Sequence, residues 1–539
     1  MSNNPPSIFN DVLGPVMRGP SSSHSAAANR IGRLARDLAG EPVRKLVARY
    51  DPNGSLVTTH KDQGTDMGLY SGILGWSPDD DRMTRVDKSL VSEGIEVEVL
   101  YENYDAPHPN FYRLEITGES GDVYALDAIS TGGGMIELKA IDGVVTSGIG
   151  DLNSLLFWFD EEPEIETHLL ENSEKSEWLP RNEGGGIFRI DTREDYSNEN
   201  VAKLAEFLKA EKFRALKAVL PVLSRKDLAV PFLRCGELLS HPQLKGKLLW
   251  EAAAAYEAER GGISSTEVIQ QMKQLAEVMA AAVTSGLSGT SYQDRILPSQ
   301  SPGMVQAEEA GKLIPADINN RIIRYVSAIM EVKSSMGVIV AAPTAGSCGA
   351  MPGAVLAVAD ALSVSEEERA RALLVAGLIG VFITKDSTFA AEEGGCMAEC
   401  GSGSAMAAAA IVHLAGGSTD EQITAASMAL QNSFGMVCDP IANRVEAPCL
   451  GKNVMAATNA LSCANMALAG YDHLIPFDEV VVAMNQVAKQ IPRELRCTNL
   501  GGLSITPTAE KIAERLSGCG SGCGCAPAAE DQSSAKVPV

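Results

Sequence analysis

The chain has 539 residues, a hydrophobic fraction of 45% and a formal net charge of −24 at pH 7. This length predicts about three domains, each able to bury its own core. A surface this acidic repels phosphate backbones and anionic lipid, so we expect neither nucleic acid nor a membrane as partner.

The N-terminus, MSNNPPSIFNDVLGP, lacks the basic and apolar regions of a secretory signal. Two apolar stretches follow later in the chain. Residues 371–383 are too short to cross a bilayer, and residues 336–362 are interrupted by proline and glycine. We therefore expect a cytoplasmic protein.

Residues 1–160 alternate short runs rich in β-branched and aromatic residues with turns, which predicts strands. The predicted strands are VRKLVARYD, SLVTTH, EVEVLYEN, FYRLEITGES and DVYALDAIS. One strong helix is predicted at 25–40, SAAANRIGRLARDLAG, because it opens after a serine run and ends in glycine. This part is predicted to be an α+β domain.

The rest of the chain changes composition. Residues 161–200 are acidic and polar, and we interpret them as a small element followed by a linker. Residues 201–508 show helical periodicity, as in STEVIQQMKQLAEVMAAAV and ERARALLVAGLIGVFITK, and predict a mostly helical domain. Residues 509–539 are predicted to be a Cys- and Gly-rich flexible tail. The predicted fold class is α+β, an N-terminal α+β domain followed by a helical one.

The chain has eleven cysteines. In a reducing compartment, clustered cysteines indicate metal binding or catalysis more than disulfides. Cys396, Cys438 and Cys449 lie in loops rich in glycine or proline, and thiolates select zinc or iron–sulfur clusters. Cys235 and Cys463 are better explained as small buried apolar residues. Spacing alone leaves a metal site and a buried core as alternatives, and the paired CxxC knuckles of a zinc ribbon are absent from the sequence.

Several motifs in order along the chain resemble one enzyme family. AEEGGCMAECGSGSAM, NSFGMVCDPIANRVEAPCLGKN and APTAGSCGAMPG resemble the α part of iron–sulfur-dependent L-serine dehydratases (L-serine ammonia-lyases). VMRGPSSSHSAAANRIGRLAR, the GTD at 64–66 and STGGGMIELKA at 130–140 resemble the β part. The resemblance covers most of residues 8–508, as if the β and α parts were fused.

The resemblance implies a [4Fe–4S] cluster held by Cys396, Cys438 and Cys449, with one iron left open for the substrate. It also implies an amino-acid substrate bound between the two parts. The substrate-binding candidates are Ser21, Ser22, Ser23, Ser130, Gly132, Gly133 and Thr344, and the catalytic candidates are His24, His60, Gln63, Thr65 and Asp66. From the residues alone, the serine run at a helix start is better explained by ordinary N-capping by one serine, with His24 on the surface.

The sequence departs from the family pattern at several places. Gln63 stands where the family typically has the histidine of Gly-His-Gly-Thr-Asp, and glutamine cannot take a proton at neutral pH. His24 and His60 are therefore the candidates for the base. The segments 386–391 and 289–301 and residue Arg18 also differ. Cys400 is an extra cysteine, interpreted as core or as a spare thiol. The tail cysteines could cap the open iron, help to load the cluster, or have no function; they are Cys519, Cys523 and Cys525.

Three functional hypotheses follow. The first is [4Fe–4S]-dependent conversion of L-serine to pyruvate and ammonia. The second is the same chemistry on another β-hydroxy or β-thiol acid, because the pocket departs from the family at Gln63 and 386–391. The third is a non-catalytic iron–sulfur sensor that has lost its base. The family resemblance also implies a homodimer.

Overall fold

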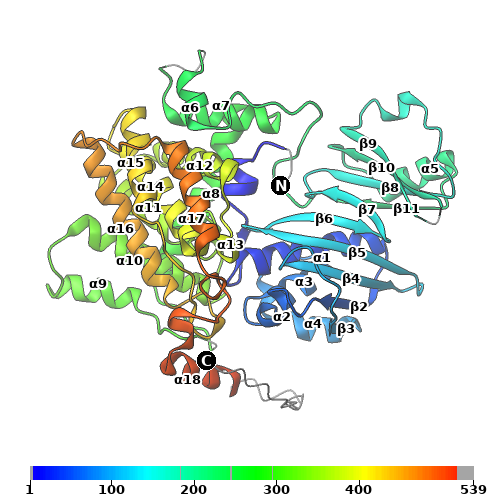
Figure 1. Cartoon of the computed structure of the whole chain (residues 1–539), viewed down its shortest axis with the longest axis horizontal. Coiled ribbons are helices and arrows are strands. Elements are labelled where there is room, and N and C mark those ends of the chain that lie inside the picture. Colours follow the sequence, from blue (N-terminus) through cyan, green and yellow to red (C-terminus); the bar gives the residue numbers. More distant parts are fainter. Residues whose placement is uncertain (1–3, 183, 243–245, 294, 519–539) are drawn as a thin grey trace, which may run out of the picture.

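The computed structural model describes residues 4–182, 184–242, 246–293 and 295–518. A part built on two β-sheets lies beside a helical part that contains most of the second half of the chain (Figure 1). The predicted α+β class, with the sheets first and the helices after them, is confirmed.

A six-stranded sheet forms the core of the N-terminal region. Its strand order is β3-β2-β4-β5-β6-β7, with β2 and β3 parallel and the other neighbours antiparallel. The strands are β2 Val43–Tyr50, β3 Glu96–Tyr101, β4 Phe111–Gly118, β5 Val123–Gly132, β6 Met135–Ile141 and β7 Val144–Gly148. Helix α1, Ala27–Ala39, packs on this sheet and ends at Gly40 in the left-handed conformation, as predicted.

One predicted strand is wrong. SLVTTH forms the short helix α2, Leu56–Thr59, which precedes α3, Thr65–Ile73, and α4, Val86–Glu93. The Asp51 carboxylate accepts a hydrogen bond from the N–H of Asn53, and the Thr59 hydroxyl donates to the carbonyl of Ser55. These local bonds favour a turn and a helix over the strand that β-branched residues suggest.

The expected linker at 161–200 is also wrong. Two strands from this segment, β9 Lys175–Pro180 and β10 Gly186–Thr192, join β8 Asn153–Phe159 and β11 Lys212–Leu216 in an antiparallel sheet of order β11-β8-β10-β9. Helix α5, Asn198–Leu208, crosses the predicted boundary at residue 201 and packs on this sheet with its own small core. Most of the described acidic residues of this segment are exposed, whereas Asp191 is buried and forms an ion pair with Arg189.

Helices α12 and α14 lie at the centre of the helical part, because both are buried around their circumference. The helices of this part are α6 Cys235–Ser240, α7 Leu249–Gly261, α8 Ser265–Leu287, α9 Ser301–Glu309, α10 Asp317–Ser334, α11 Ala350–Ala361, α12 Glu366–Asp386, α13 Ala391–Cys396, α14 Ser402–Leu414, α15 Thr419–Gln431, α16 Cys449–Leu468, α17 Phe477–Gln490 and α18 Pro507–Gly518. The stretch 391–414 is long and apolar enough to cross a membrane, but 94% of its apolar window is buried in the protein, as in a core helix.

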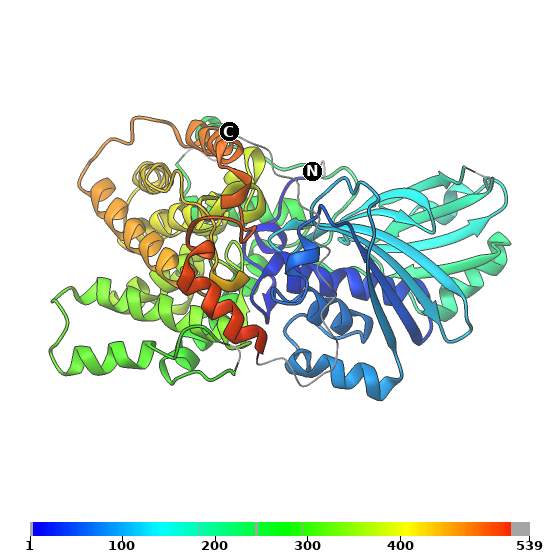
Figure 2. The same ribbon diagram turned by 60° about the horizontal axis from the view of Figure 1, so that its bottom comes forward.

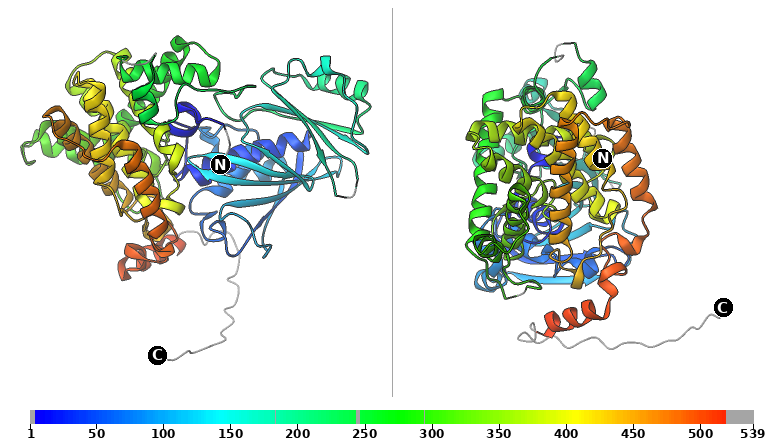
Figure 3. Two further views of the ribbon diagram at one scale, coloured as in Figure 1. Left: turned by 45° about the horizontal axis from the view of Figure 1, so that its top comes forward. Right: turned by 90° about the vertical axis from the view of Figure 1, so that its left-hand side faces the viewer.

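The first residues of the chain belong to the helical part and not to the N-terminal domain. Strand β1, Val16–Met17, pairs with β12, Ile339–Val340, and the π-helical turn Ile8–Val12 packs against α12. Figures 2 and 3 show this dark blue segment between the two parts. The N-terminal domain was predicted to begin at residue 1, but in the structure it begins after β1.

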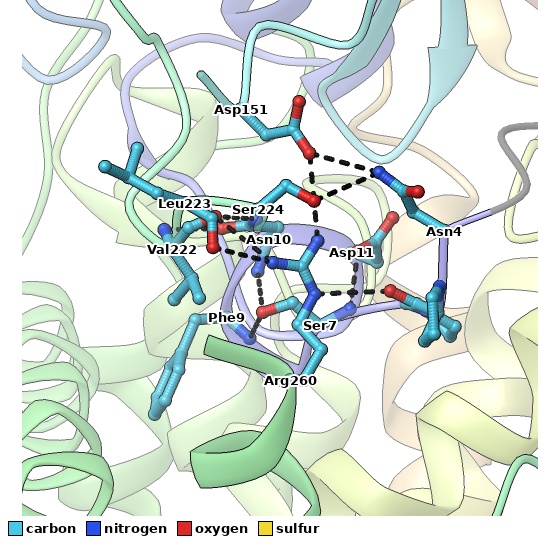
Figure 4. Close-up of polar contacts among 12 residues, drawn as sticks. Asn4, Ser7, Phe9, Asn10, Asp11, Asp151, Val222, Leu223, Ser224 and Arg260 are labelled. Carbon is cyan, nitrogen blue, oxygen red and sulfur yellow. Dashed lines mark hydrogen bonds and ion pairs between the residues drawn. The ribbon is translucent and has the colours of Figure 1, made fainter. Parts of the chain in front are cut away.

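Figure 4 shows how this segment is anchored. The Asn10 side chain donates to the carbonyl of Val222 (2.7 Å) and accepts from its N–H (3.0 Å). The buried Arg260 guanidinium donates to the carbonyls of Pro5 and Leu223, each at 3.2 Å. These contacts tie the N-terminus to the connection between the sheets and the helices.

The flexible tail predicted at 509–539 is wrong in its first part. Residues 507–518 form helix α18, so the first part of the predicted tail is helical. The tail cysteines Cys519, Cys523 and Cys525 lie outside the described residues.

Candidate active site

Three segments of the helical part bring Cys396, Cys438 and Cys449 together. Cys396 ends α13, Cys438 follows α15 in the proline-containing loop, and Cys449 is the first residue of α16. All three are buried. The thiols of Cys396 and Cys438 and a carboxylate oxygen of Glu399 lie within 4.8 Å of one another, and Cys449 interacts electrostatically with Cys396. The structure thus gathers the three cysteines that the sequence singles out.

Glycine and lysine fix the position of Cys396. Gly395 has φ +65°, and a Cβ there would lie 2.9 Å from the carbonyl oxygen of Met436, so the two loops meet at backbone distance. Lys452 donates to the carbonyl of Val437 and to Asp439, both at 2.6 Å, and its ammonium lies 3.8 Å from the Cys396 sulfur. A cation is therefore held against a thiol of the group.

The chemistry of these donors fits an iron–sulfur cluster. The thiols are soft ligands, they are buried, and they come from Gly- and Pro-containing loops that can surround a cluster. Hydrogen bonds with Cys396 and Cys497, followed by burial, raise the pKa of the Cys438 thiol, and burial raises the pKa of Cys449. A bound metal cation reverses this preference and releases the thiol protons.

A chain of contacts connects the serine run to the cysteines. Ser22 lies in the π-helical turn Ser22–Ala26, and its hydroxyl accepts a hydrogen bond from the N–H of Ala345 (3.2 Å). The adjacent Thr344 hydroxyl donates to Glu399 at 2.6 Å. Burial raises the pKa of Glu399 to about 7. The N-terminal domain therefore reaches the cysteine group through Thr344 and Glu399.

His24 faces this junction. Its Nδ1 is hydrogen-bonded to the Ser21 hydroxyl (3.0 Å) and lies 3.9 Å from Glu392, while its Nε2 is hydrogen-bonded to Thr59 (3.0 Å). Burial lowers the pKa of His24 to about 4, so the imidazole is neutral at physiological pH. Its neighbour Ser23 is buried in the same turn.

One other predicted residue presents a hydroxyl that has no hydrogen-bond partner among the described residues. The buried Ser130 hydroxyl is of this kind, whereas the buried Thr65 hydroxyl interacts with the Tyr112 hydroxyl. Ser130 lies in the β5–β6 hairpin, and its N–H donates to the carbonyl of Asn110. At the hairpin tip Gly132 has φ +100°, and a Cβ there would lie 3.1 Å from the Ala390 side chain, so the tip approaches the start of α13. Buried hydroxyls without partners are expected where a polar ligand binds.

His60 and Gln63 are oriented differently from His24. Both ring nitrogens of His60 are engaged, Nδ1 with Asp66 (2.8 Å) and Nε2 with the Tyr101 hydroxyl (2.8 Å). Gln63 is buried, and its side-chain amide contacts residues of the helical part. Its Nε2 donates to Asn443 Oδ1 at 2.9 Å, and it lies 3.9 Å from the Cys497 sulfur. Gln63 thus contacts the cysteine loop.

Sequence reasoning missed Glu392, Glu399, Asn443 and Cys497, which the structure adds to the site. Glu392 and Glu399 lie within the AEEGGCMAEC motif, and Asn443 lies between Cys438 and Cys449, so their positions carried a signal. Asn443 also donates to the carbonyl of Thr58 at 2.9 Å, which completes a reciprocal contact with the segment containing Gln63. Cys497 had no recognisable motif and is found only through its contacts.

Two cavities are lined in part by residues of the site, and a third lies elsewhere. One of about 700 Å³ is lined by the hairpin tip at Gly132 and Gly133 and by Phe389. One of about 290 Å³ opens beside Asn443 and Thr498. A third cavity, of about 1090 Å³, lies between α1 and the second sheet, and none of the cysteines lines it.

Comparison with known proteins gives consistent matches. Residues 244–504 match the family described as "Serine dehydratase alpha chain". The chain is 37% identical over 287 residues to the "Probable L-serine dehydratase, alpha chain" of Bacillus subtilis (strain 168), covering 53% of this chain and 96% of the relative. It is 27% identical over 501 residues to "L-serine dehydratase 2" of Escherichia coli (strain K12) and 26% identical over 500 residues to "L-serine dehydratase" of Streptomyces coelicolor, in each case covering 90% of this chain and 96% of the relative.

Proposed function

This chain belongs to the L-serine dehydratase family, with the β and α parts in one polypeptide, and we propose that it converts L-serine to pyruvate and ammonia at a [4Fe–4S] cluster. Family membership makes it an enzyme of the lyase class. We propose that Cys396, Cys438 and Cys449 hold the cluster. When bound, the cluster supplies a Lewis-acidic iron that polarises the β-hydroxyl of the substrate.

The observation that carries this proposal is the continuous line of contacts from the serine run to the cysteines. Ser22 meets Ala345, the adjacent Thr344 meets Glu399, and Glu399 lies with the thiols of Cys396 and Cys438. A small amino acid placed along this line touches hydroxyl donors at one end and the metal site at the other. This arrangement suits a substrate whose carboxylate and β-hydroxyl must be held together.

We propose His24 as the base that removes the α-proton. Its imidazole is neutral because it is buried, so it can accept a proton, and its Nδ1 faces Ser21 and Glu392 at the junction. His60 bonds only Asp66 and Tyr101 of its own domain, whereas His24 lies 3.9 Å from Glu392 of the helical part. We therefore propose that His60 orients the segment between α2 and α3. Gln63 binds Asn443 and takes no part in proton transfer.

The buried hydroxyls position the substrate. The Ser130 hydroxyl has no partner among the described residues, and a bound carboxylate or ammonium group would satisfy it. Ser21, Ser22 and Ser23 add donors at the turn that precedes α1. His24 takes the α-proton and the β-hydroxyl leaves as hydroxide, which recovers this proton to form water. The remaining aminoacrylate then hydrolyses to pyruvate and ammonia.

The test is anaerobic purification of the full chain, with measurement of iron, sulfide and pyruvate formation from L-serine. We expect iron, sulfide and activity to be lost together in Cys396→Ser. We expect His24→Gln to keep the iron and lose activity by about 100-fold or more, the usual range for a general base. His60→Gln is the matched control and should retain much more activity. Full activity of His24→Gln would refute the base assignment, and activity that persists after complete iron removal would refute the cluster.

A second candidate keeps the cluster and changes the substrate to another β-hydroxy or β-thiol amino acid. The observation that favours it is that the Gln63 amide is hydrogen-bonded to Asn443, while the half-buried carboxyl of Glu392 lies beside His24. A panel of L-serine, L-threonine and L-cysteine compared by kcat/KM decides between them. An iron-loaded protein that turns over none of these would instead support a sensing role.

A further inference from the structure

The cavity of about 700 Å³ lies where the β5–β6 hairpin of the N-terminal domain meets the end of α12 and the start of α13. Its outer wall includes the exposed residues Thr131, Lys385 and Glu393. Its inner wall includes Ser387 and Phe389, which are buried. Both parts of the protein therefore contribute to it, and its volume lies within the usual range of small-molecule sites, roughly 300–1,000 Å³.

A polar group inside the cavity lacks a partner. The Ser387 side chain lines the cavity and is only 4% exposed, and its buried hydroxyl has no hydrogen-bond partner among the described residues. Such a hydroxyl is stable only where water or a polar ligand reaches it. Lys385 and Glu393 add charges of both signs at the outer wall. The cavity therefore suits a small zwitterion better than an apolar molecule.

One strand separates this cavity from the candidate substrate site. Ile129 and Thr131 of β5 both line the cavity. Because successive side chains of a strand point to opposite faces, Ser130 between them points away from it. The buried Ser130 hydroxyl, which has no partner in the described part of the chain, is the one that we assign to substrate binding. The cavity and this hydroxyl therefore lie on the two faces of a single strand.

Two further segments have side chains on both sides of the same boundary. Phe389 lines the cavity, whereas Glu392 of the same segment lies 3.9 Å from His24. His108 also lines the cavity, and Asn110, two residues later, is hydrogen-bonded to Glu392. The cavity is thus one layer of chain away from the candidate base. We call the segments that form this layer the partition: residues 108–110, 129–132 and 389–393.

The partition has little side-chain bulk where the hairpin tip meets α13. Gly132, Gly133 and Gly134 have φ of +100°, +61° and +92°, conformations that favour glycine. A Cβ at Gly132 would lie 3.1 Å from the Ala390 side chain. Glycine backbone and one methyl group therefore close the partition at this point, and a small displacement of the hairpin tip separates them.

We propose that this cavity is the entrance to the active site, through which L-serine enters and pyruvate and ammonia leave, and that the partition opens where Gly132 meets Ala390. The inference rests on the proposed function, because the entrance serves the same substrate. The charged side chains of the outer wall meet the ammonium and carboxylate groups of the amino acid, and the Ser387 hydroxyl offers a hydrogen bond further in. Opening of the partition then brings the substrate to Ser130.

Alkylation of a thiol placed behind the partition tests the route without turnover. Ser130→Cys in the full chain provides the thiol, iodoacetamide is the probe, and mass spectrometry of the peptide containing residue 130 gives the rate. We expect the added change Lys385→Trp, which fills the outer part of the cavity, to slow this alkylation by about 10-fold. Val123→Trp, at an exposed position of β5 that does not line the cavity, is the matched control and should leave the rate unchanged.

Kinetics of the iron-loaded chain with native Ser130 provide the second readout. Thr131→Trp and Lys385→Trp fill the cavity from opposite walls. Each should lower kcat/KM for L-serine by about 10-fold and make it fall further as sucrose raises the viscosity, because passage through the cavity becomes rate-limiting. Iron content should not change, and Val123→Trp should behave as the wild type.

The outcomes separate this inference from the proposed function. A wild-type protein that forms no pyruvate refutes the proposed function, and the alkylation rates still decide whether the cavity leads to Ser130. A pyruvate-forming protein in which Lys385→Trp and Thr131→Trp behave as Val123→Trp in both readouts overturns only the entrance. Circular dichroism checks folding, and if Lys385→Trp does not fold, Thr131→Trp decides from the opposite wall.

Discussion

A buried carboxyl that contacts the N-terminal segment makes the protein less stable as the pH rises. A salt-bridged acid has the opposite effect, because its contribution is lost as the pH falls. Glu257 of α7 is fully buried, and it accepts hydrogen bonds from the Ser7 hydroxyl (2.5 Å) and the N–H of Ile8 (2.7 Å). Burial nevertheless raises its pKa from 4.5 to about 7, with Arg260 opposing the shift and Asp11 adding to it. The charged form is thus disfavoured in the folded protein.

The magnitude follows from linkage between protonation and folding. Because the folded pKa lies above the unfolded one, the folded state binds more protons between these two values. The stability contribution of Glu257 is fully present below the unfolded pKa and is lost as the pH rises through about 7. A rise of this size corresponds to roughly 3 kcal/mol at about 1.4 kcal/mol per pKa unit.

Urea unfolding of wild type and Glu257→Gln between about pH 5 and about pH 8 measures this effect. Glutamine is neutral throughout and still accepts a hydrogen bond from Ile8. As the pH rises, the free energy of unfolding should therefore decrease less in the variant than in the wild type, by up to roughly 3 kcal/mol. Glu259→Gln, at an exposed position of the same helix, is the control and should follow the wild type. Parallel pH profiles for wild type and Glu257→Gln would refute the reasoning.

Two further predictions concern the packing of the N-terminal domain and the surroundings of the cysteines. Gly68→Ala should lower the free energy of unfolding by about 1–3 kcal/mol in urea, because its Cβ would lie 2.0 Å from the Ser25 carbonyl oxygen. Gly303→Ala, with no described atom within 4 Å of its Cβ, is the control, and equal effects would contradict the packing argument. Lys452→Met removes the ammonium 3.8 Å from the Cys396 sulfur, so iron retention against a chelator should fall by about 10- to 100-fold. Unchanged retention would show that the lysine does not support the site.

The parts of the fold that the sequence predicts are those with strong local signals. Helix α1 has a serine run before it and Gly40 after it, and both the helix and its end are where they were expected. The strand predicted at 55–60 failed because side-chain bonds from Asp51 and Thr59 outweigh β-propensity there. The linker predicted at 161–200 failed because acidic edge strands look like loops in composition, although GIFRIDT is fully buried in β10.

In the site, too, only the residues that lie within local motifs could be predicted from the sequence. Cys396, Cys438 and Cys449 could be found because they lie within motifs. The structure places the thiols of Cys396 and Cys438 together, and Cys449 interacts electrostatically with Cys396. Cys497 and the contact of Gln63 with Asn443 could not be found, because they join residues hundreds of positions apart in the chain. No local propensity or spacing encodes a contact of that kind. The substitution at Gln63 was noticed as a departure, but its partner was visible only in three dimensions.

The N-terminal segment has a consequence for synthesis on the ribosome. Ile8 and Val12 pack against Gly377 and Gly380 of α12, so this segment has its packing partners nearly four hundred positions later in the chain. At usual elongation rates α12 is completed roughly 20 to 75 s after this segment leaves the exit tunnel. The sheet domain can fold during that interval while this apolar segment stays without its partner. The nascent chain therefore exposes a short hydrophobic site for chaperones until most of the protein has been translated.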